Sequence, residues 1–217
     1  MKNIPRIFVD DNIDTGIQVP LSRETMHYLT RVMRTRECLV FGNGNEYTAR
    51  ISDDDKKLII GDKTLHVDPS NNITLMFAPI KHTDDLINMA TQMGIGRFLP
   101  VVTARTVVHH INWDRMRKIA VEASEQSNRN SVPEIMPAVK FSDLDLSNIV
   151  FADERAAYGE STSSDFNVEK ILIGPEGGFS DDEFVALDAA GARGIGLGKT
   201  ILRAETAAIV ALAKIIK

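Results

Sequence analysis

The chain has 217 residues, of which 43% are hydrophobic and 25% charged, and its formal net charge is −5 at pH 7. This composition excludes a disordered or collagen-like chain, and the longest apolar run, Ala207–Ala213, is too short to span a bilayer. The single cysteine, Cys38, excludes an internal disulfide. Because the N-terminal stretch also lacks the apolar core of a signal peptide, we expect a cytoplasmic protein.

The first seventy residues predict a small β-barrel, because short apolar runs alternate with tight turns. A helix is expected over Arg23–Arg36, where apolar residues recur at helical spacing. The run Gly42–Asn45 has the sequence GNGN, which is typical of a hairpin turn. The expected strands are Arg6–Val9, Cys38–Phe41, Glu46–Ile51, Leu58–Ile60 and Lys63–Val67.

Strands and helices alternate after the polar linker Asp68–Asn72, which predicts an α/β domain with a mainly parallel sheet. The last helix is apolar nearly all round, so we expect it to be buried on every side. The chain should therefore divide into domains 1–70 and 71–217. The expected strands are 73–78, 97–102, 148–152, 169–173 and 194–197, and the expected helices are 84–93 capped by Thr83, 112–128 capped by Asn112, 180–191 and 205–217.

The segment Ile171–Phe184, ILIGPEGGFSDDEF, predicts the end of a buried strand, a glycine-rich loop and the start of a helix. Ser180 and Glu183 form the S-x-x-E pattern of a capping box. In an open α/β sheet, ligands bind at such strand-to-helix loops. The acidic Glu176 suits a cationic or hydroxyl-bearing ligand better than a phosphate. The alternative is that the loop is only a structural turn.

Several common site motifs are absent or incomplete in the sequence. Gly198–Thr200 resembles the end of a P-loop, but Arg193 occupies the position of the required first glycine. No GxGxxG dinucleotide pattern, HExxH zinc pattern or GxSxG elbow is present, so we expect no metal site.

Two segments are basic although the whole chain is acidic. Basic residues outnumber acidic ones both in Arg23–Arg36 and in Arg97–Arg129. These segments could contact nucleic-acid phosphates, or they could be solvated helix faces. Net charge by itself argues mildly against a nucleic-acid partner.

The loop motifs resemble those of a known family, the RsmE-type 16S ribosomal RNA uracil-N3 methyltransferases of the SPOUT superfamily. The resemblance covers nearly the whole chain. The sequence differs from the family pattern at Glu37-Cys38, Asp153-Glu154 and Lys199-Thr200. The matching residues are Ile173–Ser180 with Glu183, Leu197-Gly198, Ile201–Arg203 and Glu205–Ala207, then Glu122-Ala123, Glu125–Ser127 and Arg129 with Val132-Pro133, Lys81 and Gly94, and finally His27–Leu29 and Arg31–Arg34.

The resemblance implies a PUA-like β-barrel domain, which binds RNA, followed by a domain with a trefoil knot. It also implies S-adenosylmethionine as cofactor, small-subunit ribosomal RNA as partner and a homodimer. The cofactor residues that it implies are Phe151, Asp153, Glu154, Ile173, Gly174, Pro175, Glu176, Gly177, Gly178, Leu197, Gly198, Ile201, Leu202 and Thr206.

The same resemblance implies roles for charged residues. Arg203 would stabilise charge on the base, and Glu205 would act as acid/base or hold Arg203. Glu205 could instead be a carboxylate at a helix N-terminus. Contacts to ribosomal RNA phosphates are expected from Arg23, Arg31, Arg34, Arg105 and Arg129.

Two alternatives to uridine N3 methylation stay open at this stage. A knotted RNA methyltransferase could act on another base or on a ribose 2′-hydroxyl. A protein of this fold could also be a non-catalytic RNA-binding assembly factor.

Overall fold

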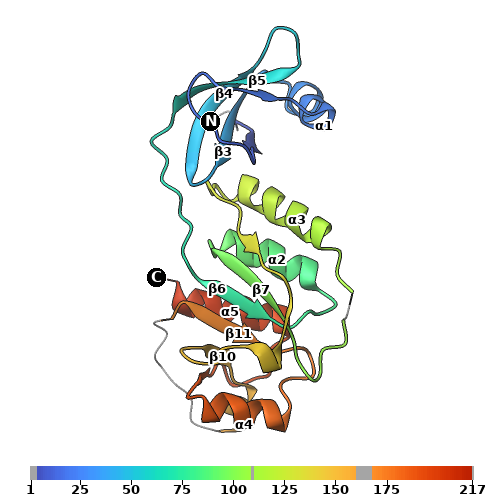
Figure 1. The fold of residues 1–217 in the computed structure, drawn as a ribbon, viewed down its shortest axis with the longest axis vertical. Helices are drawn as coiled ribbons and strands as arrows, with labels where there is room; N and C mark the ends of the chain where they lie inside the picture. Colours follow the sequence, from blue (N-terminus) through green and yellow to red (C-terminus); the bar gives the residue numbers. More distant parts are fainter. Residues whose placement is uncertain (1–3, 109, 160–167, 217) are drawn as a thin grey trace. The chain divides into compact units, whose positions relative to one another are not determined.

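The computed structural model describes residues 4–108, 110–159 and 168–216, which form two compact units (Figure 1). Met1–Ser70 and Val121–Val132 make up the first unit, and Asn71–Ala120 and Pro133–Lys217 make up the second. The division after Ser70 lies at the linker. Residues 121–132, which were expected in the second domain, pack within the first unit.

The first unit is built on a five-stranded sheet with the order β1-β3-β4-β5-β2. β1 lies parallel to β3, and the other neighbours are antiparallel. The predicted hairpin between β3 and β4 is confirmed, and Asn43 and Gly44 have the positive φ values, 51° and 78°, that such turns need. The strands are β1 (Arg6–Phe8), β2 (Gln18–Pro20), β3 (Glu37–Gly42), β4 (Asn45–Ile51) and β5 (Lys57–Lys63).

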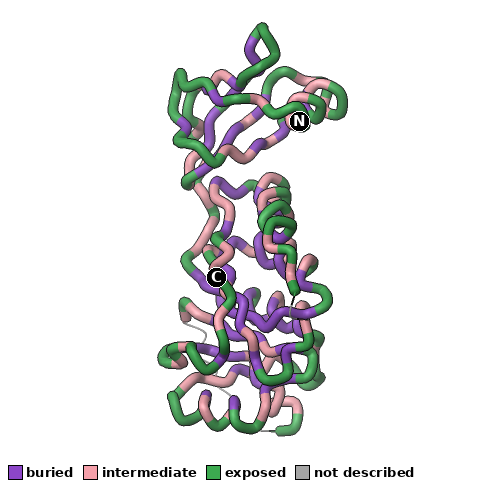
Figure 2. The backbone as a smooth tube through the Cα atoms, turned by 45° about the vertical axis from the view of Figure 1, so that its right-hand side comes forward, coloured by how far each residue is buried: buried purple, intermediate pink, exposed green. Residues whose placement is uncertain are grey.

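Two strand predictions in this unit are wrong. A single strand, β5, replaces the two that were expected between Leu58 and Val67. The edge strand β2 was missed, because Val19 is its one buried residue and a proline ends it. Neither difference alters the interior of the unit, which is a cluster of buried apolar residues (Figure 2).

The helix of the first unit changes its type along its length. It begins as α1 (Arg23–His27), where the Ser22 side chain accepts a hydrogen bond from the Thr25 N–H at 3.0 Å. It continues as the π-helix η1 (Tyr28–Val32) and ends four residues before the predicted end. Leu29 anchors it, because its side chain is fully buried in the core of the unit.

The second unit contains a sheet with the order β12-β10-β11-β6-β7-β8, and β9 also pairs with β7. All of these strand pairs are parallel, as predicted. The central strands are buried on both faces and are apolar without alternation. The strands are β6 (Thr74–Phe77), β7 (Arg97–Val102), β8 (Glu134–Ile135), β9 (Val139–Lys140), β10 (Val150–Ala152), β11 (Lys170–Ile173) and β12 (Arg193–Ile195).

Helices follow most of these strands (Figure 1). Asn112 caps α3 as predicted, since its side chain accepts the Arg115 N–H at 3.0 Å. Thr83 does not cap α2, because its hydroxyl bonds both backbone groups of Ile80 instead. The helices are α2 (Thr83–Gln92), α3 (Trp113–Gln126), α4 (Asp181–Ala189) and α5 (Ala204–Ile215), with short 3-10 turns η2 (Phe141–Asp143) and η3 (Glu154–Tyr158).

The last helix, α5, is not buried on every side in the chain by itself. It packs against α2 and β11 through one face, on which Ala208 and Leu212 are fully buried. Thr206 and Ala213 on other faces are exposed. Small alanines raise the apolar content of a helix without requiring that every face be covered. Within the described ranges, no helix is long and apolar enough to cross a membrane.

Candidate functional site

A pocket of about 250 Å³ lies in the second unit, where the chain leaves the carboxyl ends of β10, β11 and β12. This is the edge of a parallel sheet at which ligands bind. The lining residues come from three loops and from the first turn of α5: Ala152, Asp153, Glu154, Ala157, Ile173, Gly174, Pro175, Glu176, Gly178, Phe179, Leu197, Gly198, Thr200, Ile201, Leu202, Arg203, Ala204 and Ala207.

Glycine is required at one position of the loop after β11. Gly178 has a φ of +69°, and a Cβ there would collide with the carboxylate of Glu154. The Gly178 N–H also donates to the Pro175 carbonyl at 2.9 Å, which closes the turn. The backbone of the loop therefore lies directly against a pocket carboxylate, in a conformation that other residues rarely adopt.

The capping box of α4 is confirmed, and it does more than the sequence predicted. Ser180 accepts the Glu183 N–H at 3.2 Å, and one Glu183 carboxylate oxygen accepts the Ser180 N–H at 2.8 Å. The other oxygen of the buried Glu183 accepts the Ala104 N–H at 2.8 Å. One carboxylate thus joins the glycine loop to the loop after β7, a contact over 79 residues that no local pattern signals.

Two charged side chains connect the glycine loop to other parts of the second unit. Arg105, which is exposed, donates to the Gly177 carbonyl at 2.9 Å. Glu176 accepts the Lys81 N–H at 3.3 Å, so part of its role is to tie the loop to the chain before α2. Arg105 therefore contacts the loop, and one of the five N–H donors of its guanidinium is used there.

The carboxylates beside the pocket differ in their surroundings. Asp153 is buried and receives hydrogen bonds from the Arg155 N–H and guanidinium, which also pairs with Asp188 at 2.8 Å. The hydrogen bond from Arg155 lowers the pKa of Asp188. Burial raises the pKa of Glu154, although Arg105 opposes that shift. Asp153 therefore has structural partners, whereas Glu154 presents a partly desolvated carboxylate to the pocket.

Most of the expected cofactor residues lie in this lining. Phe151 and Gly177 do not, because Phe151 is fully buried in the core and Gly177 faces Arg105. Thr206 is exposed outside the lining. Four lining residues lie outside the expected cofactor loops: Ala157, Phe179, Ala204 and Ala207. The spacing of Ala204 and Ala207, one helical turn apart, is the one signal that could have suggested them.

The two expected catalytic residues lie at different places. Arg203 lines the pocket and is exposed, and its side chain makes no hydrogen bond or ion pair with any residue that the structure describes. Glu205 is half-buried in the first turn of α5 and lies outside the lining. The geometry thus brings Arg203 but not Glu205 to the cavity.

The five arginines expected at RNA also differ. Arg23, Arg31 and Arg34 are exposed in the first unit, and Arg105 is exposed in the second. The expectation for Arg129 is wrong, because its side chain is 1% exposed. Burial lowers the pKa of Arg129 to about 10, against the opposing charge of Asp68, and its Nε donates to Ser70 at 3.0 Å.

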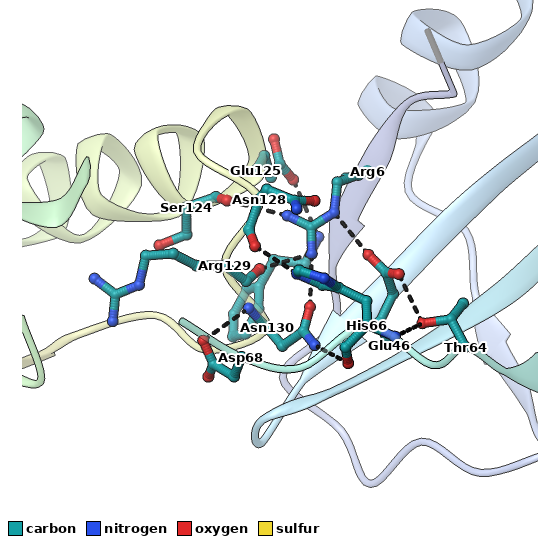
Figure 3. Close-up of polar contacts among 11 residues, drawn as sticks. Arg6, Glu46, Thr64, His66, Asp68, Ser124, Glu125, Asn128, Arg129 and Asn130 are labelled. Atoms are coloured by element: carbon teal, nitrogen blue, oxygen red, sulfur yellow. Dashed lines mark hydrogen bonds and ion pairs between the residues drawn. The ribbon is translucent and has the colours of Figure 1, made fainter. Parts of the chain in front are cut away.

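Arg129 belongs to a network of polar side chains inside the first unit (Figure 3). Arg6 is at its centre and bonds Glu46 at 2.8 Å, the Asn130 side chain at 2.8 Å and the Arg129 carbonyl at 2.7 Å. These bonds tie the segment 121–132 to the strands β1 and β4. This network explains why that segment belongs to the first unit.

Among residues 4–108, 110–159 and 168–216, no group of three or more His, Cys, Asp or Glu side chains could hold a metal ion. The pocket therefore offers apolar side chains, backbone groups, carboxylates and one arginine. Such a set suits an organic ligand with a flat or aliphatic part and a positive charge.

Known proteins resemble this chain over nearly its whole length. Residues 68–216 match the family model of the RNA methyltransferase domain, and residues 21–63 match that of the RNA methyltransferase PUA domain. A ribosomal RNA small subunit methyltransferase E from Rickettsia conorii is 32% identical, over 97% of this chain and 94% of the relative. A protein of the same name from Mesomycoplasma hyopneumoniae is 30% identical, over 91% of this chain and 93% of the relative.

A solved structure agrees with these relatives. The crystal structure of a ribosomal RNA small subunit methyltransferase E from Neisseria gonorrhoeae bound to S-adenosyl methionine matches with a TM-score of 0.82. It is 26% identical and covers 97% of this chain and 96% of its own. The chain therefore belongs to the ribosomal RNA small subunit methyltransferase E family, with a PUA-like domain followed by an RNA methyltransferase domain.

Proposed function

We propose that this protein is an enzyme that methylates N3 of a uridine in 16S ribosomal RNA, with S-adenosylmethionine as the methyl donor. The observation that carries the proposal is the pocket at the ends of β10, β11 and β12, where Arg203 lines the cavity and pairs with no residue that the structure describes. A related protein of the same family binds S-adenosyl methionine.

The lining of the pocket fits this cofactor chemically. Leu197, Ile201 and Leu202 offer apolar surface for an adenine ring. The bare backbone at Gly174 and Gly198 allows close approach to ribose and base edges. Glu154 and Glu176 supply negative charge for a sulfonium. When bound, S-adenosylmethionine supplies a methyl group that is already activated for an in-line transfer.

The residues of the chain would then align the acceptor, exclude water and handle charge. Uracil N3 carries a proton that it must lose, so negative charge develops on the base. We assign Arg203 to stabilise that charge or to orient the base, since its guanidinium is at the cavity and offers a fork of N–H donors. Glu205, outside the lining, is assigned to hold Arg203 or the start of α5.

The partners and assembly follow from the same proposal. The substrate would be small-subunit ribosomal RNA, within an assembled or nearly assembled subunit, in the cytoplasm. Arg23, Arg31, Arg34 and Arg105 would contact its phosphates. A homodimer joined through the second unit, and a trefoil knot in that unit, are proposed on the resemblance to the family. The functional domains would correspond to residues 1–70, extended by 121–132, and to the rest of the chain.

The modified nucleotide tests the proposal directly. Small subunits from a strain that lacks the gene are incubated with the protein and isotopically labelled S-adenosylmethionine, and the digested RNA is analysed by mass spectrometry. We expect labelled 3-methyluridine. A label on another base or on a ribose would establish one of the related activities instead. Absence of detectable cofactor binding by calorimetry would leave a non-catalytic RNA-binding factor.

A further inference from the structure

The first unit contains a hollow of about 930 Å³ that has no part in the pocket described above. It lies beside β1, between the α1–η1 helix and the segment 121–132, and all of its lining belongs to the first unit. The lining residues are Ile4, Pro5, Arg6, Ile7, Phe8, Glu24, Thr25, Tyr28, Met33, Val121, Glu122, Glu125, Gln126 and Asn128. The volume is sufficient for a nucleotide base.

The π-helix η1 explains how Tyr28 and Met33 come to share this wall. The Met33 N–H donates to the Tyr28 carbonyl at 2.9 Å, a bond across five residues. In a regular α-helix, with 3.6 residues per turn, residues five apart point to different faces. The wider turn of the π-helix places Tyr28 and Met33 on the same side of the helix. Single π turns occur frequently at functional sites.

Tyr28 is the exposed aromatic side chain of this wall, with 38% of its surface accessible. Its neighbour Leu29 is fully buried, so the core of the unit holds the helix in place beneath it. Proteins that bind unpaired RNA stack its bases on such aromatic rings. Tyr28 thus presents an aromatic ring in the wall of the hollow.

Two arginines follow Tyr28 closely along the chain, one within η1 and one just after it, outside the lining of the hollow. Arg31 and Arg34 are exposed, and neither makes a hydrogen bond or ion pair within the described part of the chain. Arg34 has a φ of +53°, a conformation that is uncommon for a residue other than glycine. The cation of Arg34 is therefore carried by a backbone conformation that glycine would adopt more readily. These cations suit the phosphates on either side of a base.

The wall of the hollow itself carries negative charge. Glu24 and Glu122 are exposed there, and Glu125 is half-buried with one oxygen accepting the Phe8 N–H at 3.0 Å. These carboxylates would repel a phosphate, whereas they can accept hydrogen bonds from N–H groups on the edge of a base. Guanine presents two adjacent N–H donors, from N1 and N2, that match the two oxygens of one carboxylate. Uracil N3–H is flanked by two carbonyl oxygens that a carboxylate repels.

We propose that this hollow binds one unstacked guanine of the RNA substrate, with its ring on Tyr28, its donor edge on Glu24 or Glu122, and the flanking phosphates on Arg31 and Arg34. The inference rests on the proposed function in that it takes RNA as the substrate. The hollow would then contribute to the choice of RNA site independently of the methyl-transfer pocket. Selectivity by one splayed base is the usual way in which proteins read unpaired RNA.

The test measures binding of fluorescein-labelled single-stranded RNA hexamers by anisotropy, with guanosine, inosine or uridine at one central position. We expect the guanosine hexamer to bind most tightly, since inosine lacks the N2 amino group. Tyr28→Ala should weaken its binding about tenfold, because the stacking of one base is lost. Tyr28→Phe should bind within about twofold of the unchanged protein, because it keeps the ring.

Two further variants complete the design. Leu65→Ala, at a side chain that is 99% exposed in the same unit, is the matched control and should bind as the unchanged protein does. The double variant Glu24→Gln with Glu122→Gln should lose the preference for guanosine over inosine. Thermal unfolding of each variant verifies that the unit stays folded.

Two results would overturn the proposal: wild-type affinity in Tyr28→Ala, or equal affinity of the unchanged protein for the three hexamers. Methylation of ribosomal RNA is measured in parallel with the unchanged protein. If methylation persists while either result is found, the guanine site is wrong and the proposed function stands. If the unchanged protein methylates no RNA, the proposed function itself fails.

Discussion

One arginine from each unit illustrates two different uses of this residue. In the first unit, Arg6 is 8% exposed and makes hydrogen bonds to Glu46, Asn130 and backbone carbonyls, so its charge holds the unit together. In the second unit, Arg203 lines a cavity, and no described residue pairs with it. A buried arginine must be paired because desolvation is costly, and an arginine at a pocket can stay available for a ligand. Burial and pairing therefore distinguish the structural Arg6 from Arg203, which is available for function.

Removing the available arginine should cause the largest effect. We expect Arg203→Ala to lower methyl transfer to ribosomal RNA at least about a thousandfold, because charge on the base loses its stabilising group. Cofactor binding, measured by calorimetry, should change only slightly. Lys199→Ala, an exposed lysine of the same loop outside the pocket, is the matched control and should remain active. Wild-type turnover by Arg203→Ala would refute the role.

Removing the structural arginine should affect stability instead of chemistry. Arg6→Ala leaves the buried Glu46 carboxylate without its positively charged partner, and among the described residues only the Thr64 hydroxyl still donates to it; we expect a cost of about 3 kcal/mol in the free energy of unfolding. Urea unfolding followed by circular dichroism measures it. Arg50→Ala is the control, since its side chain is 58% exposed and its contact to Asp53 is 4.0 Å long. Equal stability of the two variants would show that the network of Figure 3 contributes little.

The glycine loop offers a test of the pocket itself. Gly178→Ala should weaken binding of S-adenosylmethionine about tenfold or more, since the new Cβ collides with Glu154 and the backbone is strained. Gly191→Ala is a close control, because Gly191 has a similar φ of +71° but no atom within 4 Å of its Cβ position. Calorimetry on both variants separates backbone strain from the collision. Equal cofactor affinity of the two would count against the pocket.

The exposed arginines of the first unit should act through salt-dependent RNA binding. Each phosphate contact on single-stranded RNA contributes about 0.7 to the slope of log affinity against log salt. Arg31→Ala combined with Arg34→Ala should therefore reduce the slope by about 1.4. Arg36→Ala is the control, since Arg36 already pairs with Asp55 at 2.6 Å. An unchanged slope in the double variant would mean that η1 does not face RNA.

The smallest expected effect concerns acid stability of the first unit. Burial raises the pKa of Asp68, but hydrogen bonds from Ser70, Ser131 and the Asn130 N–H outweigh it, and the net pKa is lowered. A lowered pKa in the folded state stabilises the protein above the usual aspartate pKa of about 4, and that stability is lost as the pH falls through the folded value. Asp68→Asn should therefore flatten the decline of the urea midpoint below about pH 4.

Asp62→Asn, at an exposed aspartate of β5, is the control for this measurement. It should follow the acid profile of the unchanged protein. If the acid profile of Asp68→Asn coincides with those of the unchanged protein and of Asp62→Asn, Asp68 does not contribute to acid stability.

Local patterns in the sequence were sufficient for much of the fold. The bounds of β7, the hairpin at Asn43-Gly44 and the capping box at Ser180 are confirmed, because neighbouring residues determine each of them. The loop motifs also predicted where the pocket lies, because the ends of strands and the glycines can be recognised in the amino-acid sequence. The family assignment rested on these same short-range features.

Only the tertiary structure decided which charged residues are structural. Arg129 and Arg31 both lie in basic stretches of the sequence, yet Arg129 is buried and Arg31 is exposed. Likewise, Glu183 joins two loops 79 residues apart, and 121–132 belongs to the first unit. Sequence patterns specify backbone conformation over a few residues, whereas burial and charge pairing depend on segments that meet only after the chain has folded.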